Sequence, residues 1–368
     1  MSQNRYTHLI NLLQSAGLDA LVLNPGPTLT YLTSLVFHLS ERPTVLLVQP
    51  PVAPALILAG LEILKAKQSS VPVQPFTYND NPDSWQEAFN KAVQALHMDG
   101  KRIGVEPERL RVLELNFLES AAPGAKFIPA GDLLANLRMR KDEEEIAAMR
   151  KAVEIAQQAL LATQPLIKAG ISEQQVATEL TLQLLRAGSD PQVPFAPIVS
   201  SGPNSANPHA SPSQRLLAHG DLLVIDWGAA YHGYFSDLTR TFAIGKVSPE
   251  FEKIAKVVAE ANAAGRNTAR PGIPAGSVDQ AARAVITQAN YGPYFHHRVG
   301  HGLGMEGHEP PYMYGENQLT LAEGMTFTVE PGIYLADRGG VRIEDDVVIT
   351  RDGAETLSDL PRQLIRLG

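Results

Sequence analysis

Hydrophobic and polar residues alternate between helical and strand-like spacing over the first third of the chain. A helix is predicted to end at Gly17, because the apolar residues before it recur at i, i+3, i+4 and i+7: Leu9, Leu12, Leu13 and Ala16. Four short apolar runs predict buried strands: LDALVLN, TVLLV, ALILA and RIGVE. Residues 85–96, between the last two of these runs, have helical periodicity. This alternation predicts a small α/β domain over residues 1–132.

The pattern changes near residue 131. Residues 133–170 are rich in alanine, leucine and charged residues and contain few helix breakers, which predicts one long helix or a pair of helices. A further helix is predicted over residues 172–187, since a serine can cap its start and a glycine its end. Beyond Pro191, strand-like runs are broken by glycine, proline and asparagine. We therefore expect a second domain over residues 133–368.

The composition excludes several classes of protein. With 368 residues, 44% hydrophobic and 19% charged, the chain resembles a folded protein of two domains. It has no cysteine, which excludes disulfides, thiolate metal sites and a cysteine nucleophile. A net charge of -8 argues against a nucleic-acid partner. The start lacks a signal pattern, and three prolines interrupt the most apolar stretch, residues 44–60, so we expect a cytoplasmic protein outside the membrane.

Four of the ten histidines fall between His296 and His308. His297 and His301 are four apart, as in a helical zinc site, but the glycines of this run disfavour a helix. In an extended segment, residues four apart share a face, so both could point into one cavity. His308 would need a bend or bulge to join them. The run indicates a metal or substrate site, and histidines exposed in a loop are the alternative.

Four acidic residues interrupt apolar, strand-like runs of the second domain. They are Asp226, Asp237, Glu330 and Glu344. A buried carboxylate costs several kcal/mol unless it is paired or coordinates a cation. Arg240 and Arg342 could each pair with one acid, which is the purely structural interpretation. Four carboxylates with one imidazole favour two Mn²⁺, Co²⁺ or Fe²⁺ ions with bridging carboxylates over a single structural zinc.

The ordered set Asp226, Asp237, His301, Glu330 and Glu344, here called the ligand set, resembles the dinuclear site of the pita-bread (M24) metallopeptidases. The strings VIDWGAAYHGYFSDLTRTF, GHGLGMEGHE, TVEPGIY, GGVRIEDDVVIT and LRMRKDEEEIAAMRKA are similar to its Xaa-Pro subgroup, aminopeptidase P and prolidase. The N-terminal segment resembles the creatinase-type domain of that subgroup. The resemblance implies a mixed α/β (α+β) fold, with a creatinase-like domain over 1–132 and a pita-bread catalytic domain over 133–368.

The resemblance implies a role for each member of the ligand set. Asp226 binds one metal in bidentate fashion, and Asp237 and Glu344 bridge both metals. His301 and Glu330 complete the second metal's coordination. A water or hydroxide between the metals is the implied nucleophile. Glu330 is also the implied general base, which relays a proton to the leaving nitrogen.

Five further residues match positions near the substrate in this family. His308 is implied to be catalytic, by stabilising the tetrahedral oxyanion or holding the scissile carbonyl. His209 is implied to be both catalytic and substrate-binding, and His297 to bind substrate on the proline side. Tyr334 and Arg342 match positions that orient ligands beside the substrate. The resemblance assigns no role to three other histidines: His219, His232 and His296.

The implied activity is that of a dinuclear metal-dependent exopeptidase that cleaves Xaa-Pro bonds, at the N-terminus of peptides or in dipeptides. The implied cofactors are two divalent ions per chain, Mn²⁺ first, with Co²⁺, Fe²⁺ or Zn²⁺ as alternatives, and the implied assembly is a homodimer. Some dipeptidases of the group have an arginine shortly after the HE pair, where this chain has Tyr312. That difference favours an aminopeptidase that tolerates longer peptides.

Two alternatives on the same fold stay open. One is a creatinase-like amidine hydrolase, and the other is a non-catalytic peptide- or protein-binding module. Both branches have typically lost the metal ligands, whereas all five are present here.

Overall fold

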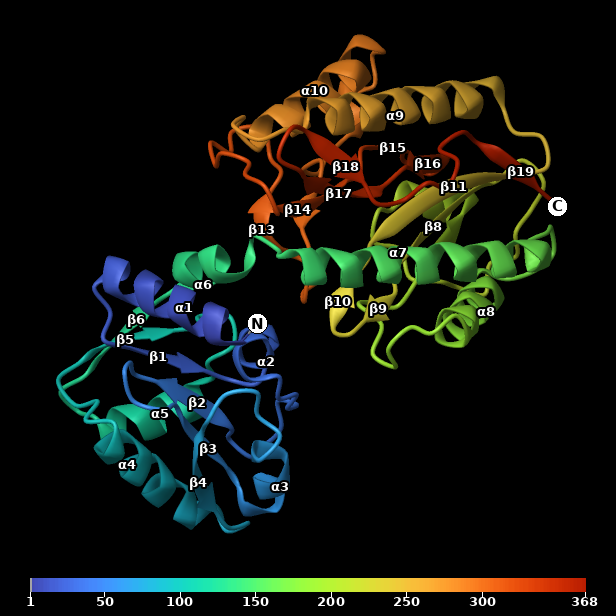
Figure 1. Ribbon diagram of the computed structural model, residues 1–368. Coiled ribbons are helices and arrows are strands. Elements are labelled where there is room, and N and C mark those ends of the chain that lie inside the picture. Colours follow the sequence, from blue (N-terminus) through green and yellow to red (C-terminus); the bar gives the residue numbers. More distant parts are fainter. Residues whose placement is uncertain (1) are drawn as a thin grey trace. The chain divides into compact units, whose positions relative to one another are not determined.

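The computed structural model describes residues 2–368, in two compact units, Met1–Arg138 and Met139–Gly368 (Figure 1). The boundary expected after residue 132 falls inside helix α6 (Gly131–Arg138). This helix packs against α1 (Ser2–Ala16) and therefore belongs to the first unit. Within the described residues, no helix is both long and apolar enough to cross a membrane.

The first unit is a mixed six-stranded sheet with helices on both faces (Figure 1). Its strands, in the order β4-β3-β2-β1-β5-β6, are β4 (Gln74–Tyr78), β3 (Ala55–Ala59), β2 (Val45–Val48), β1 (Ala20–Leu23), β5 (Arg102–Val105) and β6 (Lys126–Pro129). Its other helices are α2 (Pro27–Thr33), α3 (Ile63–Ala66), α4 (Trp85–Ala95) and α5 (Val112–Ala121). The two predicted helices correspond to α1 and α4, and the four predicted strands to β1, β2, β3 and β5, because each of these has its apolar pattern within one short segment. Strands β4 and β6 and helices α2, α3 and α5 were not predicted.

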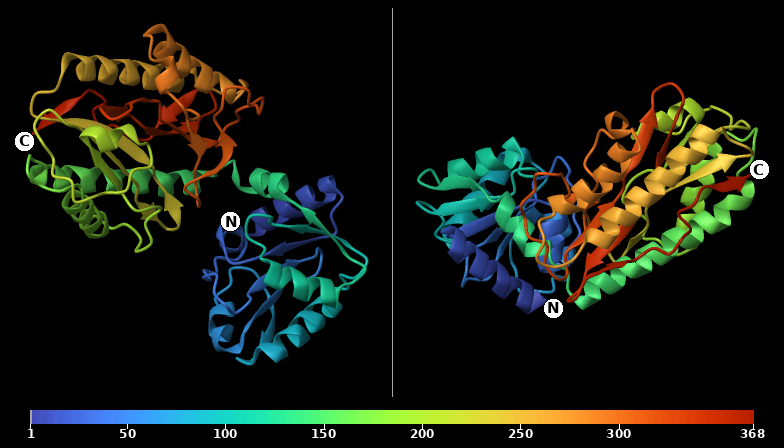
Figure 2. Two further views of the ribbon diagram at one scale, coloured as in Figure 1. Left: turned by 180° about the vertical axis from the view of Figure 1, so that it is seen from behind. Right: turned by 90° about the horizontal axis from the view of Figure 1, so that it is seen from above.

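The second unit begins with two helices, α7 (Glu143–Thr163) and α8 (Glu173–Arg186). Each begins with a capping box, at Asp142 with Glu145 and at Ser172 with Gln175, which satisfies the otherwise unpaired N–H groups of the first turn. The predicted helix pair over 133–170 is therefore α6 and α7. Two later helices, α9 (Pro249–Thr268) and α10 (Gly276–Gln288), lie on the opposite side of the strands from α7 and α8 (Figures 1 and 2).

The strands of the second unit form two larger sheets and two small hairpins. The four-stranded sheet has the order β19 (Ile365–Leu367), β11 (Leu238–Ile244), β8 (Leu222–Trp227), β7 (Ile198–Ser201). The five-stranded sheet has the order β13 (Glu309–Tyr312), β12 (His301–Gly302), β14 (Thr326–Val329), β17 (Asp345–Ile349), β18 (Ala354–Thr356). The hairpins are β9 (Ala230–Tyr231) with β10 (Tyr234–Phe235), and β15 (Gly332–Leu335) with β16 (Gly339–Arg342). Short 3₁₀ turns are η1 (Gly60–Glu62), η2 (Pro82–Ser84), η3 (Gln164–Leu166), η4 (Gly202–Ala206) and η5 (Gly292–Tyr294).

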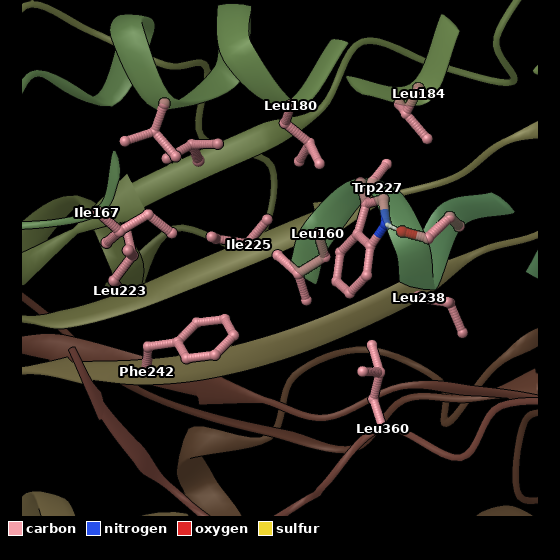
Figure 3. Packing of buried hydrophobic residues seen from close by; sticks show 14 of the residues in the cluster. Leu160, Ile167, Leu180, Leu184, Leu223, Ile225, Trp227, Leu238, Phe242 and Leu360 are labelled. Carbon is pink, nitrogen blue, oxygen red and sulfur yellow. Dashed lines mark hydrogen bonds between the residues drawn. The ribbon is translucent and has the colours of Figure 1, made fainter. Parts of the chain in front are cut away.

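A large apolar core lies between α7, α8 and the four-stranded sheet (Figure 3). Trp227 is fully buried in it beside Leu160 and Ile225, and its indole N–H donates to the Ala156 carbonyl at 2.8 Å. This bond satisfies the one polar group that the indole carries into the core. The core therefore holds β8 in place directly beside Asp226.

Candidate metal centre and cavity

The four acidic residues lie at neighbouring strand ends in the second unit. Asp226 is the penultimate residue of β8, and Asp237 immediately precedes β11. Glu330 immediately follows β14, and Glu344 immediately precedes β17. A bridge between Thr239 and Glu344 joins the two larger sheets at this point. Segments that are far apart in the sequence thus converge on one buried position.

The ligand atoms of this cluster are close enough to share cations. Asp237, His301 and Glu344 each offer one atom within 4.8 Å of the others, and all three side chains are buried. His301 Nε2 lies 3.4 Å from Glu330 Oε1 and 3.7 Å from Asp237 Oδ2. Asp226 Oδ1 is buried without a hydrogen-bond partner among the described residues. The structure therefore brings all five members of the ligand set together.

Burial and mutual repulsion act on the carboxyl groups of the ligand set. Burial, and then Glu344 and Asp226, raise the pKa of Asp237 well above its ordinary value. Burial also raises the pKa of Glu330 to about 8, and the pKa of Glu344 is raised well above normal by burial together with Glu330 and Asp226. Four adjacent carboxyl groups are thus unfavourable as anions unless cations bind among them.

The His301 ring is oriented to offer one nitrogen to a cation. Its Nδ1 lies 3.1 Å from the Gly302 carbonyl, which requires Nδ1 to carry the proton. Nε2 then carries no proton, and its lone pair is directed at the acids. Burial, followed by the nearby His308, lowers the pKa of His301 to about 3, so the ring is neutral at neutral pH.

Arg342 connects the ligand set to two residues that were expected near the substrate. Its guanidinium donates to Asp226 Oδ2 at 2.6 Å and to the Tyr334 hydroxyl at 3.1 Å. The Tyr334 hydroxyl lies 3.0 Å from His297 Nε2, and His297 Nδ1 lies 2.7 Å from the Arg298 carbonyl. Burial lowers the pKa of His297 to about 4, so the tyrosine donates to a neutral ring. Arg342 neutralises one acid, whereas Arg240 pairs with Asp345 outside the ligand set.

A cavity of about 660 Å³ opens onto the ligand set. His209, His297 and His308 line it together with all five members of the ligand set and Arg342. Tyr334 is buried and is not among the residues that line the cavity; it contacts the lining residues His297 and Arg342. The cavity thus places the three histidines expected near the substrate beside the acids.

His308 reaches His301 through an irregularity in the sheet. The register of β12 against β13 shifts between His301 and Gly302, and His308 immediately precedes β13. The rings of His301 and His308 are 3.8 Å apart between centroids. A bulge of this kind re-aims a side chain, which is the bend that the sequence spacing required. His297, in contrast, lies in an irregular segment before β12 rather than in a strand.

Sequence reasoning left out several residues of the cavity wall. They are Pro194, Phe195, Ile198, Pro208, His296, Arg298 and Gly307. The first three come from a proline-rich stretch whose local pattern carries no chemical signature. Arg298 lies inside the histidine-rich run, and its guanidinium lies 4.3 Å from the centre of the Tyr312 ring. The position of this charged residue inside a histidine-rich run is the sequence signal that could have identified it as part of the cavity.

The fold and the chemistry of the ligand set together define a class of protein. Four buried carboxylates, one neutral imidazole and an unpartnered carboxylate oxygen fit hard divalent cations with oxygen-rich coordination. The residues present therefore fit divalent cations of this kind. The fold and the site are those of a metal-dependent hydrolase.

Comparisons with known proteins agree with this class. Residues 147–351 match metallopeptidase family M24, and residues 5–140 match the creatinase/prolidase N-terminal domain. An Xaa-Pro dipeptidase of Lactobacillus delbrueckii subsp. lactis is 34% identical over 357 residues, 97% of each chain. A dipeptidase structure from Pyrococcus horikoshii OT3 superposes with a TM-score of 0.92 at 36% identity, covering 99% of this chain and 100% of that chain. For an X-Pro aminopeptidase structure from Thermotoga maritima MSB8 the TM-score is 0.86 at 32% identity, with 98% and 99% covered.

The chain belongs to metallopeptidase family M24 and carries a creatinase/prolidase N-terminal domain. It is therefore a peptidase of the metal-dependent kind.

Proposed function

We propose that this metallopeptidase cleaves the bond between a first residue and a proline in second position. The proposal is supported by a cavity in which the ligand set, four further histidines and a half-buried apolar wall meet. The names of its relatives, which include an Xaa-Pro dipeptidase and an X-Pro aminopeptidase, support the same substrate class.

The five residues of the ligand set would hold two divalent ions, with Asp237 and Glu344 shared between them. Such ions would polarise the scissile carbonyl and lower the pKa of a water molecule. Oxygen-rich coordination with one imidazole favours Mn²⁺, with Co²⁺, Fe²⁺ and Zn²⁺ as alternatives. Restoring the chelated protein with each metal separately, and comparing rates at equal occupancy, tests this order.

The protein's own side chains perform the proton transfers and the positioning. Glu330, at the open end of β14, accepts the proton of the attacking water and delivers it to the leaving proline nitrogen. His308 donates a hydrogen bond to the carbonyl oxygen as negative charge develops on it. His209 and His297 bind the substrate from the cavity wall. Tyr334 and Arg342 hold His297 and Asp226 in their orientations.

The cavity contains a positive charge that bears on peptide length. Tyr312 stands where some dipeptidases have an arginine, which by itself favours longer peptides. Arg298, however, lines the cavity beside the Tyr312 ring, and no acid among the described residues forms an ion pair with it. A guanidinium in that place suits the free carboxylate of a dipeptide. We therefore propose that Xaa-Pro dipeptides are cleaved faster than Xaa-Pro-Xaa tripeptides, and that Arg298→Gln removes this preference.

The proposed roles of Glu330 and His308 can be separated with two variants. Glu330→Gln keeps the side chain's shape but cannot accept the proton, so kcat on Ala-Pro should fall by roughly 10²–10⁴-fold, with KM changed much less. His308→Ala should lose oxyanion stabilisation worth roughly 3 kcal/mol while both metals stay bound. Steady-state kinetics and metal analysis on the same preparations measure both effects. If His308→Ala loses its metal while Glu330→Gln keeps both metal and rate, the two roles are reversed.

Metal content also separates this proposal from its two alternatives. A creatinase-like amidine hydrolase or a non-catalytic binding module would need no bound metal, whereas the ligand set here should bind about two ions per chain. Elemental analysis of the purified protein gives the ratio directly. A preparation that binds no divalent ion and is inactive on Ala-Pro would contradict the proposal of Xaa-Pro cleavage.

We further propose that the protein is a cytoplasmic homodimer. A homodimer is what the family resemblance implies, and a chain without cysteine is compatible with a reducing compartment. Light scattering at micromolar concentration tests the assembly, and cell fractionation tests the location. A monomer throughout that concentration range would contradict the dimer.

A further inference from the structure

A buried ion pair contacts the segment that carries His308. Lys141 Nζ lies 2.5 Å from Glu309 Oε1, and the two side chains are 2% and 3% exposed. The residues are 168 positions apart in the sequence. Neither lines the cavity, and the proposed reaction uses neither directly. Because burying two opposite charges is costly, an ion pair at this position calls for an explanation.

Lys141 is attached through its backbone to the segment that leads to Glu330. Its N–H donates to the Gly324 carbonyl at 2.8 Å, and the preceding residue bridges to Met325. A side chain on Gly324 would not fit, because its Cβ would lie 2.6 Å from the Lys141 carbonyl oxygen. β14 begins directly after Met325 and ends directly before Glu330. The backbone of Lys141 is therefore fixed beside the start of the strand that leads to Glu330.

Glu309 is the first residue of β13 and the neighbour of His308. Its backbone is in register with Gly302, which follows the ligand His301. The connection from β12 to β13 contains Gly304, where an added Cβ would lie 2.7 Å from Lys141 Cε and 2.8 Å from Glu309 Oε1. The glycine thus leaves the space that the ion pair fills. The loop that carries His308 is packed directly against the two charges.

The His308 imidazole has no hydrogen bond of its own within residues 2–368. It lies over the His301 ring at 3.8 Å and is more than one-third exposed. Its place is consequently set by the backbone on either side of it. Glu309, the next residue along the chain, is held by its ion pair with Lys141.

We propose that the Lys141–Glu309 ion pair is a positioning device for the reaction, which holds the start of β13 so that the His308 imidazole stays over His301. This inference rests on the oxyanion-stabilising role of His308 in the proposed function. Lys141 and Glu309 are positioning residues that act through His308. A displacement of about 1 Å at a reacting group can cost 10²-fold in rate, so a loss of the anchor should be measurable.

The test is a double-mutant cycle between the ion pair and His308 in the metal-loaded full-length enzyme. The pair variant Lys141→Met/Glu309→Leu removes both charges together and leaves no unpaired one. We expect kcat on Ala-Pro to fall by about 10–100-fold, with KM, bound metal per chain and thermal midpoint close to wild type. Adding the pair change to His308→Ala should cause no further loss, because the ion pair acts through the interaction that His308→Ala has already removed.

A binding measurement provides a readout that does not depend on turnover. A phosphinate analogue of an Xaa-Pro dipeptide mimics the tetrahedral oxyanion, whereas free proline does not. The affinity of the pair variant for the phosphinate should fall by the same factor as kcat/KM, and its affinity for proline should stay unchanged. The control is Arg150→Met/Glu355→Gln, which removes an exposed ion pair between α7 and β18 of the same unit and should leave all values unchanged.

Several outcomes overturn the inference. The inference is wrong if the pair variant is as active as wild type, or if it loses metal together with rate. It is also wrong if the rate losses of the pair variant and of His308→Ala multiply when the changes are combined. If the pair variant does not fold, Glu309→Asp keeps the charge and shortens the side chain by one methylene. It should lower kcat in the wild-type background and have no effect in the His308→Ala background, and an equal effect in both also overturns the inference. A wild type inactive on Ala-Pro overturns the proposed function and this inference with it, whereas an active wild type with an equally active pair variant overturns the inference alone.

Discussion

Glu344 and Asp345 are neighbours in the sequence and equally buried, yet they face opposite electrostatic surroundings. Glu344 points to the ligand set, where burial, Glu330 and Asp226 raise its pKa well above normal. Burial acts in the same direction on Asp345, but Arg240 and Arg362 outweigh it and lower its pKa to about 2. Successive side chains of a strand point to opposite faces, so one residue of separation is enough for this contrast.

The surroundings of Asp345 form a saturated network. Arg240 donates to Asp345 Oδ1 at 2.8 Å, Arg362 donates to both of its oxygens, and Arg266 lies 3.5 Å away. Arg240 also donates to the Glu344 carbonyl at 2.6 Å and therefore holds the backbone of the ligand from behind. On the ligand face, Arg342 is the arginine that forms an ion pair with an acid of the described ligand set. The face that carries Asp345 is therefore built for stability, whereas the ligand face is left short of positive charge, which divalent ions can supply.

Removing a shared metal ligand from the ligand face, which is short of positive charge, should have the greatest effect. Asp237→Asn should lower the occupancy of both metals and reduce turnover by about 10³-fold or more, since metal ions contribute several kcal/mol to the transition state. The metal-free variant should be no less stable than metal-free wild type, because a repelled carboxylate has been removed. Metal titration, kinetics and thermal unfolding measure these values. A fully active variant at limiting metal would contradict the shared-ligand assignment.

The next effect concerns the opposite face, where arginines pair with the Asp345 carboxylate. Asp345→Asn leaves Arg240 and Arg266 buried without their counter-ion, so the free energy of unfolding should fall by about 3–5 kcal/mol. The chain has two tryptophans, Trp85 in the first unit and Trp227 in the second. In a Trp85→Phe background, urea unfolding followed by Trp227 fluorescence therefore reports the second unit alone. A loss below about 1 kcal/mol would mean that the two faces differ less than their geometry indicates.

The smallest effect is a pH dependence that sharpens the contrast between the two faces. In the metal-free protein the pKa of Glu330 is raised to about 8, so the folded state binds its proton more tightly than the unfolded chain does. Stability from this group is therefore greatest at low pH and falls as the pH rises through 8, by on the order of 1 kcal/mol between pH 7 and 8.5. Glu330→Gln should remove that part of the dependence. Asp345, whose pKa is lowered to about 2, contributes stability above pH 4 that is lost only as the pH falls towards 2.

The pH comparison has a defined window. Below pH 6.5 the buried neutral rings of His297 and His301 oppose the Glu330 effect, because unfolding lets them bind protons. Measurements from pH 7 to 8.5 avoid this interference. Equal slopes for wild type and Glu330→Gln in that window would contradict the raised pKa of Glu330.

Local elements of this fold could be predicted from the sequence because their determinants lie within a few residues. The helix that starts after Ser172 has its cap and its apolar stripe in the same segment, and the structure shows both. The β9–β10 hairpin between Asp226 and Asp237 was not predicted, because two-residue strands have no readable period. His297 and His301 were predicted to share one face of an extended segment; both line the cavity, but the segment between them is irregular up to β12.

The chain's sequence by itself determined the kinds of ligand and hence the chemistry. Acids inside apolar runs must meet cations or bases once they are buried, whatever the details of the fold. Only the tertiary structure decided which cation each acid meets: Arg342 pairs with Asp226, but Arg240 pairs with Asp345, and Lys141 with Glu309. These partners are far apart in the sequence and depend on strand register, where a shift of one residue exchanges the two faces. No local pattern specifies that register, because it is set by the packing of whole sheets and helices.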